Sequence, residues 1–126
     1  MTPIKHNLKI RRGADWHRIF SHRSAATGVP FDLTGCTARM QIRSELGSSV
    51  VLDSLTTENG RLVLVNRVNP LGGFVLAGID MIFPSAVTSA CTWDEGVYDL
   101  EIVRSSGLVD CMIETSKIVL TGEVTR

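Results

Sequence analysis

The sequence predicts a single all-β domain of seven or eight short strands, stacked as a sandwich or closed as a barrel. Several segments alternate apolar and polar residues with the period of a β-strand. Turn residues separate these segments at short intervals, which is typical of both architectures. The chain has 126 residues, the length of one domain, and can bury roughly two-thirds of its unfolded surface. We therefore treat residues 1–126 as one domain.

The first half of the chain is predicted to contain three well-marked strands. Residues 7–11 and 16–22 form two extended segments that are interrupted at Gly13. A polar turn at 24–30 follows, and residues 37–43 then alternate strictly between apolar and polar side chains. That alternation predicts a strand with one face in the core and one in water.

The middle of the chain carries two short apolar runs, at residues 62–65 and 74–76. Continuous apolar runs are typical of central strands that are buried on both faces. The Asn59-Gly60 pair lies just before the first run, and Asn-Gly is a strong signal for a hairpin turn.

The last third is predicted to hold one helical turn and three strands. Pro84 can occupy the first position of a helix, so a turn or two of helix is expected within residues 84–92. Residues 97–114 form a hairpin around a Ser-Ser-Gly turn, and residues 117–120 supply the closing strand. Glycines lie at three strand boundaries where a positive φ or a bulge would require them: Gly13, Gly35 and Gly96.

Charge is unevenly distributed, although the formal net charge is zero. Residues 1–23 hold six basic side chains and only one acidic one, Asp15, whereas the rest of the chain holds seven basic and twelve acidic side chains. A pI near 6.8 does not favour a nucleic acid as the partner. A basic segment on an acidic body suits internal pairing, docking onto a neighbouring copy, or a solvated strand face.

The sequence shows no catalytic, metal or cofactor motif. The three histidines, His6, His17 and His22, lie outside any recognisable nucleophile signature. Asp99 and Glu101 share one face of a strand, and we interpret them as part of a wet face. A weak calcium site in the loop at residues 94–96 is the alternative for this acidic stretch. We therefore predict neither an enzyme nor a bound cofactor.

The three cysteines, Cys36, Cys91 and Cys111, are odd in number and widely spaced, without zinc-ligand spacing. We interpret them as small buried hydrophobes of a protein made in a reducing cytoplasm, with a disulfide between two of them as the alternative. No apolar run approaches the roughly 18 residues that a membrane helix requires, so no membrane partner is expected.

Two tryptophans and three arginines are the candidate partner contacts. A tryptophan in a small sandwich either packs in the core or anchors in a partner's pocket. Trp93 favours the core or its rim, whereas Trp16, between charged neighbours, is balanced between core and interface. The full candidate set is Arg11, Arg12, Trp16, Arg18 and Trp93.

Four short signatures occur in order along the chain, each at a strand start, turn or end. They are Arg-Gly-Ala-Asp at 12–15, Pro-Phe-Asp-Leu-Thr-Gly at 30–35, Gly-Val-Tyr-Asp-Leu-Glu at 96–101, and Glu-Val-Thr-Arg at 123–126. With the Met-Gln-Ile-Arg strand end at 40–43, this order resembles small tailed-bacteriophage structural proteins with an immunoglobulin-like (Ig-like) β-sandwich. It is also similar to the N-terminal domains of some phage baseplate proteins.

The resemblance spans about residues 8–126 and implies an Ig-like antiparallel sandwich in a virion component. It implies no enzymatic activity. The partners would be other phage structural proteins in the tail, neck or baseplate, with several copies in a symmetric ring. The protein would be assembled in the bacterial cytoplasm and reside in the virion. A capsid decoration protein, or a module that binds a carbohydrate or receptor, is the alternative.

Overall fold

The computed structural model describes residues 2–22, 28, 31–68, 71 and 74–122. The last signature, at 123–126, and most of the turn predicted at 24–30 lie outside the described residues. The described elements are eight strands and one short helix: β1 (Leu8–Arg11), β2 (Trp16–Ser21), β3 (Thr37–Arg43), β4 (Val51–Thr56), β5 (Leu62–Val68), β6 (Phe74–Phe83), α1 (Ser85–Ala90), β7 (Glu95–Val103) and β8 (Val109–Thr121).

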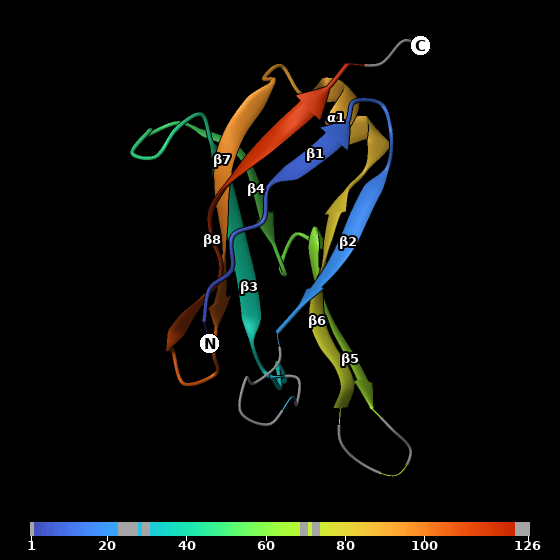
Figure 1. Cartoon of the computed structure of the whole chain (residues 1–126), viewed down its shortest axis with the longest axis vertical. Coiled ribbons are helices and arrows are strands. Elements are labelled where there is room, and N and C mark those ends of the chain that lie inside the picture. The colour runs from blue at the N-terminus through green and yellow to red at the C-terminus, as the bar shows by residue number, and fades with distance from the viewer. Residues whose placement is uncertain (1, 23–27, 29–30, 69–70, 72–73, 123–126) are drawn as a thin grey trace.

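The strands form two stacked sheets (Figure 1). One has five strands in the order β1-β8-β7-β3-β4, and the other has three in the order β2-β6-β5. If β2 to β8 are lettered B, C, C′, D, E, F and G, this is G-F-C-C′ stacked on B-E-D. That order is the immunoglobulin arrangement, which confirms the predicted Ig-like sandwich.

The core lies between the two sheets and comes from the inward positions of the alternating strands. In β3, for example, Ala38, Met40 and Ile42 are buried while the residues between them face water. Burying one such aliphatic side chain contributes about 1.5–3 kcal/mol to folding. The largest side chains with almost no exposure are Phe83, Ile10, Met40, Ile42, Leu55, Leu62, Ile79, Met81, Leu100, Ile102, Met112 and Ile113.

The C-terminal hairpin and the helical turn are both confirmed. β7 pairs antiparallel with β8, and the backbone N–H of Arg104 donates to the carbonyl of Leu108 across the turn at 2.8 Å. α1 follows Pro84, within the predicted residues 84–92. The closing strand predicted at 117–120 is not separate, because β8 runs without a break through Thr121 and absorbs register shifts near Tyr98 and Leu100.

One strand pairing departs from the antiparallel prediction. β1 pairs with β8 in parallel, joining Leu8 to Ile118 and Arg11 to Thr121, whereas the other strand pairs are antiparallel. β1 and β2 lie in different sheets, so the short turn between them crosses the sandwich instead of making a hairpin. β4 and β5 also lie in different sheets, so the turn between them crosses the sandwich as well. β4 is a strand that the sequence analysis did not predict.

The Asn59-Gly60 turn is therefore not the hairpin predicted from its sequence. It connects β4 in one sheet to β5 in the other. The Asn59 side chain holds it: its Oδ1 accepts from the backbone N–H groups of Thr56 and Arg61, both at 3.0 Å, and its Nδ2 donates to the carbonyl of Ser54 at 2.9 Å. The amide thus satisfies backbone groups that a hairpin ladder would otherwise pair.

The prediction that residues 62–65 form a strand buried on both faces is also wrong. β5 is the edge of the three-stranded sheet, and Val63 has 42% of its surface exposed. A two-layer sandwich covers only the inner face of each sheet, so every second residue of an apolar run must face outward.

Two of the three predicted boundary glycines have the expected conformation, and the third has another purpose. Gly13 and Gly35 have φ values of 79° and 76°. Gly96 lies within a strand, where an added Cβ would be 2.7 Å from the carbonyl oxygen of Arg43. Gly78 is placed in the same way, with an added Cβ 2.6 Å from the carbonyl oxygen of Phe20. In each sheet one glycine thus lets a neighbouring strand approach closely.

Candidate interaction surfaces

The first signature, residues 12–15, is a structural turn that is clamped to the rest of the fold. The hydroxyl of Thr88, which is fully buried in α1, accepts from the N–H of Gly13 at 3.1 Å and lies 3.0 Å from the carbonyl of Ala14, to which it can donate. The carboxylate of Asp15 accepts from the N–H of Ser85 at 2.6 Å, at the start of α1.

Arg12 completes this clamp and is engaged within the chain. Its guanidinium donates to the carbonyl of Trp93 at 2.5 Å and to the carboxylate of Asp94 at 2.8 Å. It thereby ties the β1–β2 turn to the entry of β7. The charge of Arg12 is satisfied internally, and internal pairing is one of the arrangements that the sequence left open for its basic segment.

The two tryptophans, Trp16 and Trp93, both pack partly against the core. Trp16 meets Phe83 edge to face, with ring centroids 5.8 Å apart, and borders a hollow of about 340 Å³ with His17, Ile82 and Pro84 among its lining residues. Trp93 lines none of the described hollows. Of the two, Trp16 is thus the one that borders one of these hollows.

The other two candidate arginines are exposed but lie on different parts of the molecule. Arg18, on the edge strand β2, sits over the ring of Phe20 at 5.6 Å from its centroid. Arg11, at the end of β1, alternates with the buried Ile10 and therefore projects from the outer side of the five-stranded sheet. The five candidates do not converge on one site.

The outer side of the three-stranded sheet, which we call the apolar face, was missed by the sequence analysis. Four aliphatic side chains gather there around the paired His17 and Asp80. Ile19 and Val63 lie on either side of Asp80 in the strand register and are 36% and 42% exposed. Val65 and Ile82 continue the face and are half-buried. The apolar run at 62–65 was the sequence signal that could have revealed this face, because an edge strand of a sandwich exposes every second residue of such a run.

The outer side of the five-stranded sheet, which we call the charged face, carries charged side chains together with Val97, Val103 and Val119, which alternate with buried residues. Its charges lie in stripes along the strands. A basic stripe on β1 and β8 consists of Lys9, Arg11 and Lys117, an acidic stripe on β7 of Glu95, Asp99 and Glu101, and a second basic stripe on β3 of Arg39 and Arg43. The register places Arg39 opposite Glu101 and Gln41 opposite Asp99. This confirms the interpretation that Asp99 and Glu101 lie on a strand face that is in contact with water.

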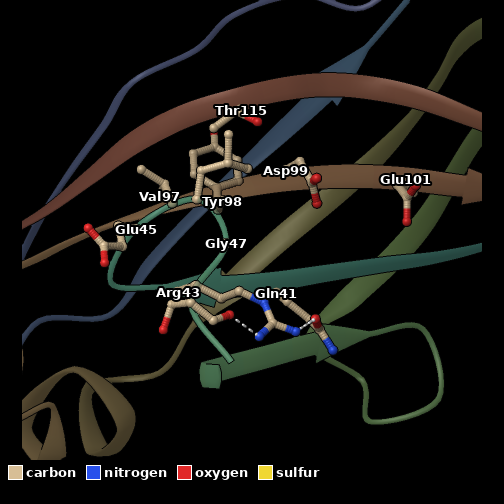
Figure 2. A pocket seen from close by; sticks show the side chains of 11 residues that line it. Gln41, Arg43, Glu45, Gly47, Val97, Tyr98, Asp99, Glu101 and Thr115 are labelled. Atoms are coloured by element: carbon tan, nitrogen blue, oxygen red, sulfur yellow. Dashed lines mark hydrogen bonds between the residues drawn. The ribbon is translucent and has the colours of Figure 1, made fainter. Parts of the chain in front are cut away.

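A hollow of about 470 Å³ lies on the charged face, between β7 and the loop that follows β3 (Figure 2). The arginines around it are already engaged. Arg43 donates to Gln41 Oε1 at 2.8 Å and to the Ser48 carbonyl at 2.6 Å, and Arg39 pairs with Glu101 at 3.0 Å.

Asp99 is left without a hydrogen bond or an ion pair among the described residues. Desolvation, and then the neighbouring Glu101 carboxylate, raise the pKa of Asp99 above its ordinary value. The guanidinium groups of Arg39 and Arg43 lower the pKa of Asp99 and offset part of this rise.

The described residues include no group of three metal-ligating side chains, so no calcium site is assembled near residues 94–96. The three cysteines are free thiols and are half-buried, whereas the sequence interpretation had them buried; desolvation raises the pKa of each. Within the described part of the chain, no helix has the length and apolar character needed to cross a membrane.

Comparisons with known proteins add little to this picture. No family model matches the chain, and no curated protein matches it. Among solved structures it is similar to murine CRIg, with a TM-score of 0.36 and 10% sequence identity over 91% of this chain and 92% of that one. The Ig-like assignment rests on the order of the strands.

Proposed function

We propose that this chain is a non-enzymatic structural protein of a tailed bacteriophage virion, in the tail, neck or baseplate, that acts through protein–protein contacts. The phage setting is supported by the order and spacing of the signatures at 12–15, 30–35, 40–43 and 96–101. The clamp around residues 12–15 gives the first signature a physical basis, because each of its residues holds the β1–β2 turn in place.

The apolar face is the observation that carries the contact role. Exposed aliphatic side chains that gather on one side of a sheet mark interaction sites in soluble proteins. Ile19 and Val63 flank Asp80 in one row of the register, so the face combines apolar area with a polar pair at its edge, the exposed His17 and the partly buried Asp80, whose side chains lie 3.1 Å apart. Apolar area with a few polar groups is the composition of an interface core.

The experiment is mass spectrometry and electron cryo-microscopy of tailed particles from a host that carries the gene. We expect the chain in the particle fraction, in multiple copies. A Val63→Lys substitution on the apolar face should reduce incorporation, whereas Gln41→Lys on the charged face serves as the matched control. Absence of the wild-type chain from purified particles would reject the proposal.

The same experiment distinguishes the nearest variant, a capsid decoration protein, because density on the head instead of the tail would identify it. Both variants use the same kind of contact, so the apolar face has the same role in each. The location is what separates them.

A carbohydrate- or receptor-binding module is the second candidate, and one observation favours it. Trp16 borders an open hollow whose lining is mostly apolar, and an aromatic ring beside a shallow surface can stack on a sugar. A glycan array should then show binding that Trp16→Ala abolishes and Trp93→Ala retains. An array without signal for the wild type would reject the carbohydrate-binding candidate and would not affect the proposed role in protein–protein contacts.

A further inference from the structure

Residues 4–7, which we call the latch segment, lie beside β8 before the chain enters β1 (Figure 1). Ile4 pairs with β8 in parallel, and its carbonyl accepts from the N–H of Glu114 at 2.8 Å. Further along, the Oδ1 of Asn7 accepts from the N–H of Lys117 at 2.9 Å. The latch segment thus pairs backbone groups of β8 that an open sheet edge would leave exposed.

His6 anchors the latch segment to both sheets. The other residues of the segment, Lys5 among them, are exposed, whereas His6 is half-buried. Its imidazole meets the ring of Phe20 on β2 edge to face, with ring centroids 5.1 Å apart. Its backbone is held by the five-stranded sheet, because the N–H donates to Ser116 Oγ at 2.9 Å and the carbonyl accepts from the hydroxyl of Tyr98 at 2.5 Å.

The surroundings of this imidazole favour its uncharged form. Nε2 of His6 is buried and has no hydrogen-bond partner among the described residues. The guanidinium of Arg18, on β2, lies over the same Phe20 ring, at 5.6 Å from its centroid. Burial, and then the positive charge of Arg18, lower the pKa of His6 below its ordinary value. A proton on His6 therefore adds a second cation beside Arg18 and leaves a buried N–H without an acceptor.

The neighbouring strands do not supply a counter-charge for a protonated His6. The imidazole takes part in none of the ion pairs among the described residues. The phenol of Tyr98, on β7, is uncharged, since burial raises its pKa, and its hydroxyl is already bonded to the His6 carbonyl. On β8, Glu114 and Lys117 are exposed to water and carry opposite charges. The charge that acts on the imidazole is therefore that of Arg18.

We infer that the latch segment is acid-sensitive: the uncharged His6 holds it against β8 at neutral pH, and protonation of His6 releases it. In the released segment the imidazole is in water and has the ordinary histidine pKa of about 6.5. The stabilisation of the docked segment is therefore complete above that pH, and it is lost as the pH falls from there through the lowered pKa of the docked state. The release is local, because Leu8 and Ile10 of β1 are 4% and 0% exposed and stay in the core.

This inference goes beyond the proposed virion function and is tested on the purified chain alone, so either can fail without the other. The test is amide hydrogen exchange followed by NMR at about pH 7.5 and about pH 5, on either side of the ordinary histidine pKa. The reporters are the N–H groups of Glu114 and Lys117, which donate to the latch segment. The reference is the N–H of Ile82, which donates to the carbonyl of Arg61 in the other sheet. We expect the protection factors of both reporters to fall severalfold at the acidic pH relative to that of Ile82.

Three variants test whether His6 is the group that titrates. His6→Phe keeps an aromatic ring against Phe20 and cannot take up a proton, so its reporters should stay protected at both pH values. Arg18→Met removes the neighbouring cation, so its fall in protection should be smaller than that of the wild type. His17→Gln is the matched control, because His17 lies on the outer side of β2 and is paired with Asp80, and it should respond as the wild type does.

The histidine signals of the same samples give the titration midpoint of His6. A midpoint at or above the ordinary histidine value would overturn the inference, and so would reporters that stay protected in the wild type once His6 is protonated. A fall in protection that His6→Phe retains, or one that Ile82 shares, would also overturn it, since the cause would then be another group or unfolding of the whole domain. Circular dichroism verifies folding. If His6→Phe does not fold, Arg18→Met decides, and a fall equal to that of the wild type rejects the inference.

Discussion

The two outer faces of this sandwich differ in chemistry although the same fold builds both. The charged face spreads five strands of alternating residues, with Arg39, Gln41 and Arg43 facing Asp99 and Glu101 across one strand pair. The apolar face has three strands, two of which are edges, and places aliphatic side chains outward on both edges. The hydrophobic core of the domain is built from the inner faces of the two sheets.

The sharpest way to test this comparison is to disturb one glycine in each sheet. Gly78→Ala and Gly96→Ala place a Cβ within 2.6 and 2.7 Å of a neighbouring carbonyl oxygen. Each should lower the free energy of unfolding by about 1–3 kcal/mol or more, because strand backbone must move apart. Gly122→Ala is the matched control, since an added Cβ there meets nothing within 4 Å. Chemical denaturation measures all three, and equal effects would refute the close-approach explanation.

The ion pairs of the molecule provide the second comparison. Arg61 and Asp53 are paired at 2.8 Å, with only 15% and 20% of their side chains exposed, and Arg61 also donates to the carbonyl of Ile82 at 3.0 Å. Arg61→Met should therefore cost about 1–3 kcal/mol, since it leaves Asp53 without its partner. Arg39→Met, on the exposed charged face, should cost less than about 1 kcal/mol.

Thermal and urea unfolding of both arginine variants would measure this contrast. An equal loss in the free energy of unfolding for the two variants would mean that the ion pair on the charged face stabilises the monomer as much as the more buried pair does. A far smaller loss for Arg61→Met than for Arg39→Met would contradict the role of burial.

The smallest expected effect concerns the pH dependence of Asp99. Because its pKa is raised in the folded state, the folded chain holds this proton more tightly than the unfolded chain does. The resulting stabilisation is present at acidic pH and is lost as the pH rises through the raised pKa. Relative to Asp99→Asn, the wild type should become less stable as the pH rises from below the ordinary aspartate pKa through the raised pKa of Asp99. A difference between the two unfolding curves that does not vary with pH would argue against desolvation at this site.

The fold class was accessible from the sequence because alternation and turn residues act locally. The strict alternation at residues 37–43 and the Ser-Ser-Gly turn after residue 104 each predicted the observed structure. Sheet membership was not accessible, because it depends on which strands meet across the sandwich. That is why Asn59-Gly60 was mistaken for a hairpin and Val63 for a core residue.

The candidate site was predicted less well, for the same reason. Arg12 could be recognised as basic from the sequence, but only the fold places Trp93 and Asp94 beside it. The apolar face draws on β2, β5 and β6, which are brought together only by sheet assembly. The stripes of the charged face likewise become visible only when the register of β1, β8 and β7 is known.

The parallel pairing of β1 with β8 also constrains the order of events as the protein is synthesised. Leu8 pairs with Ile118, and the N–H of His6 bonds to the hydroxyl of Ser116, 110 residues further along the chain. During synthesis β1 must therefore wait for β8 before it can dock. Contacts of such long range form slowly, and Leu8 and Ile10 stay uncovered in the meantime. Nascent chains should thus depend on chaperones until β8 has been synthesised.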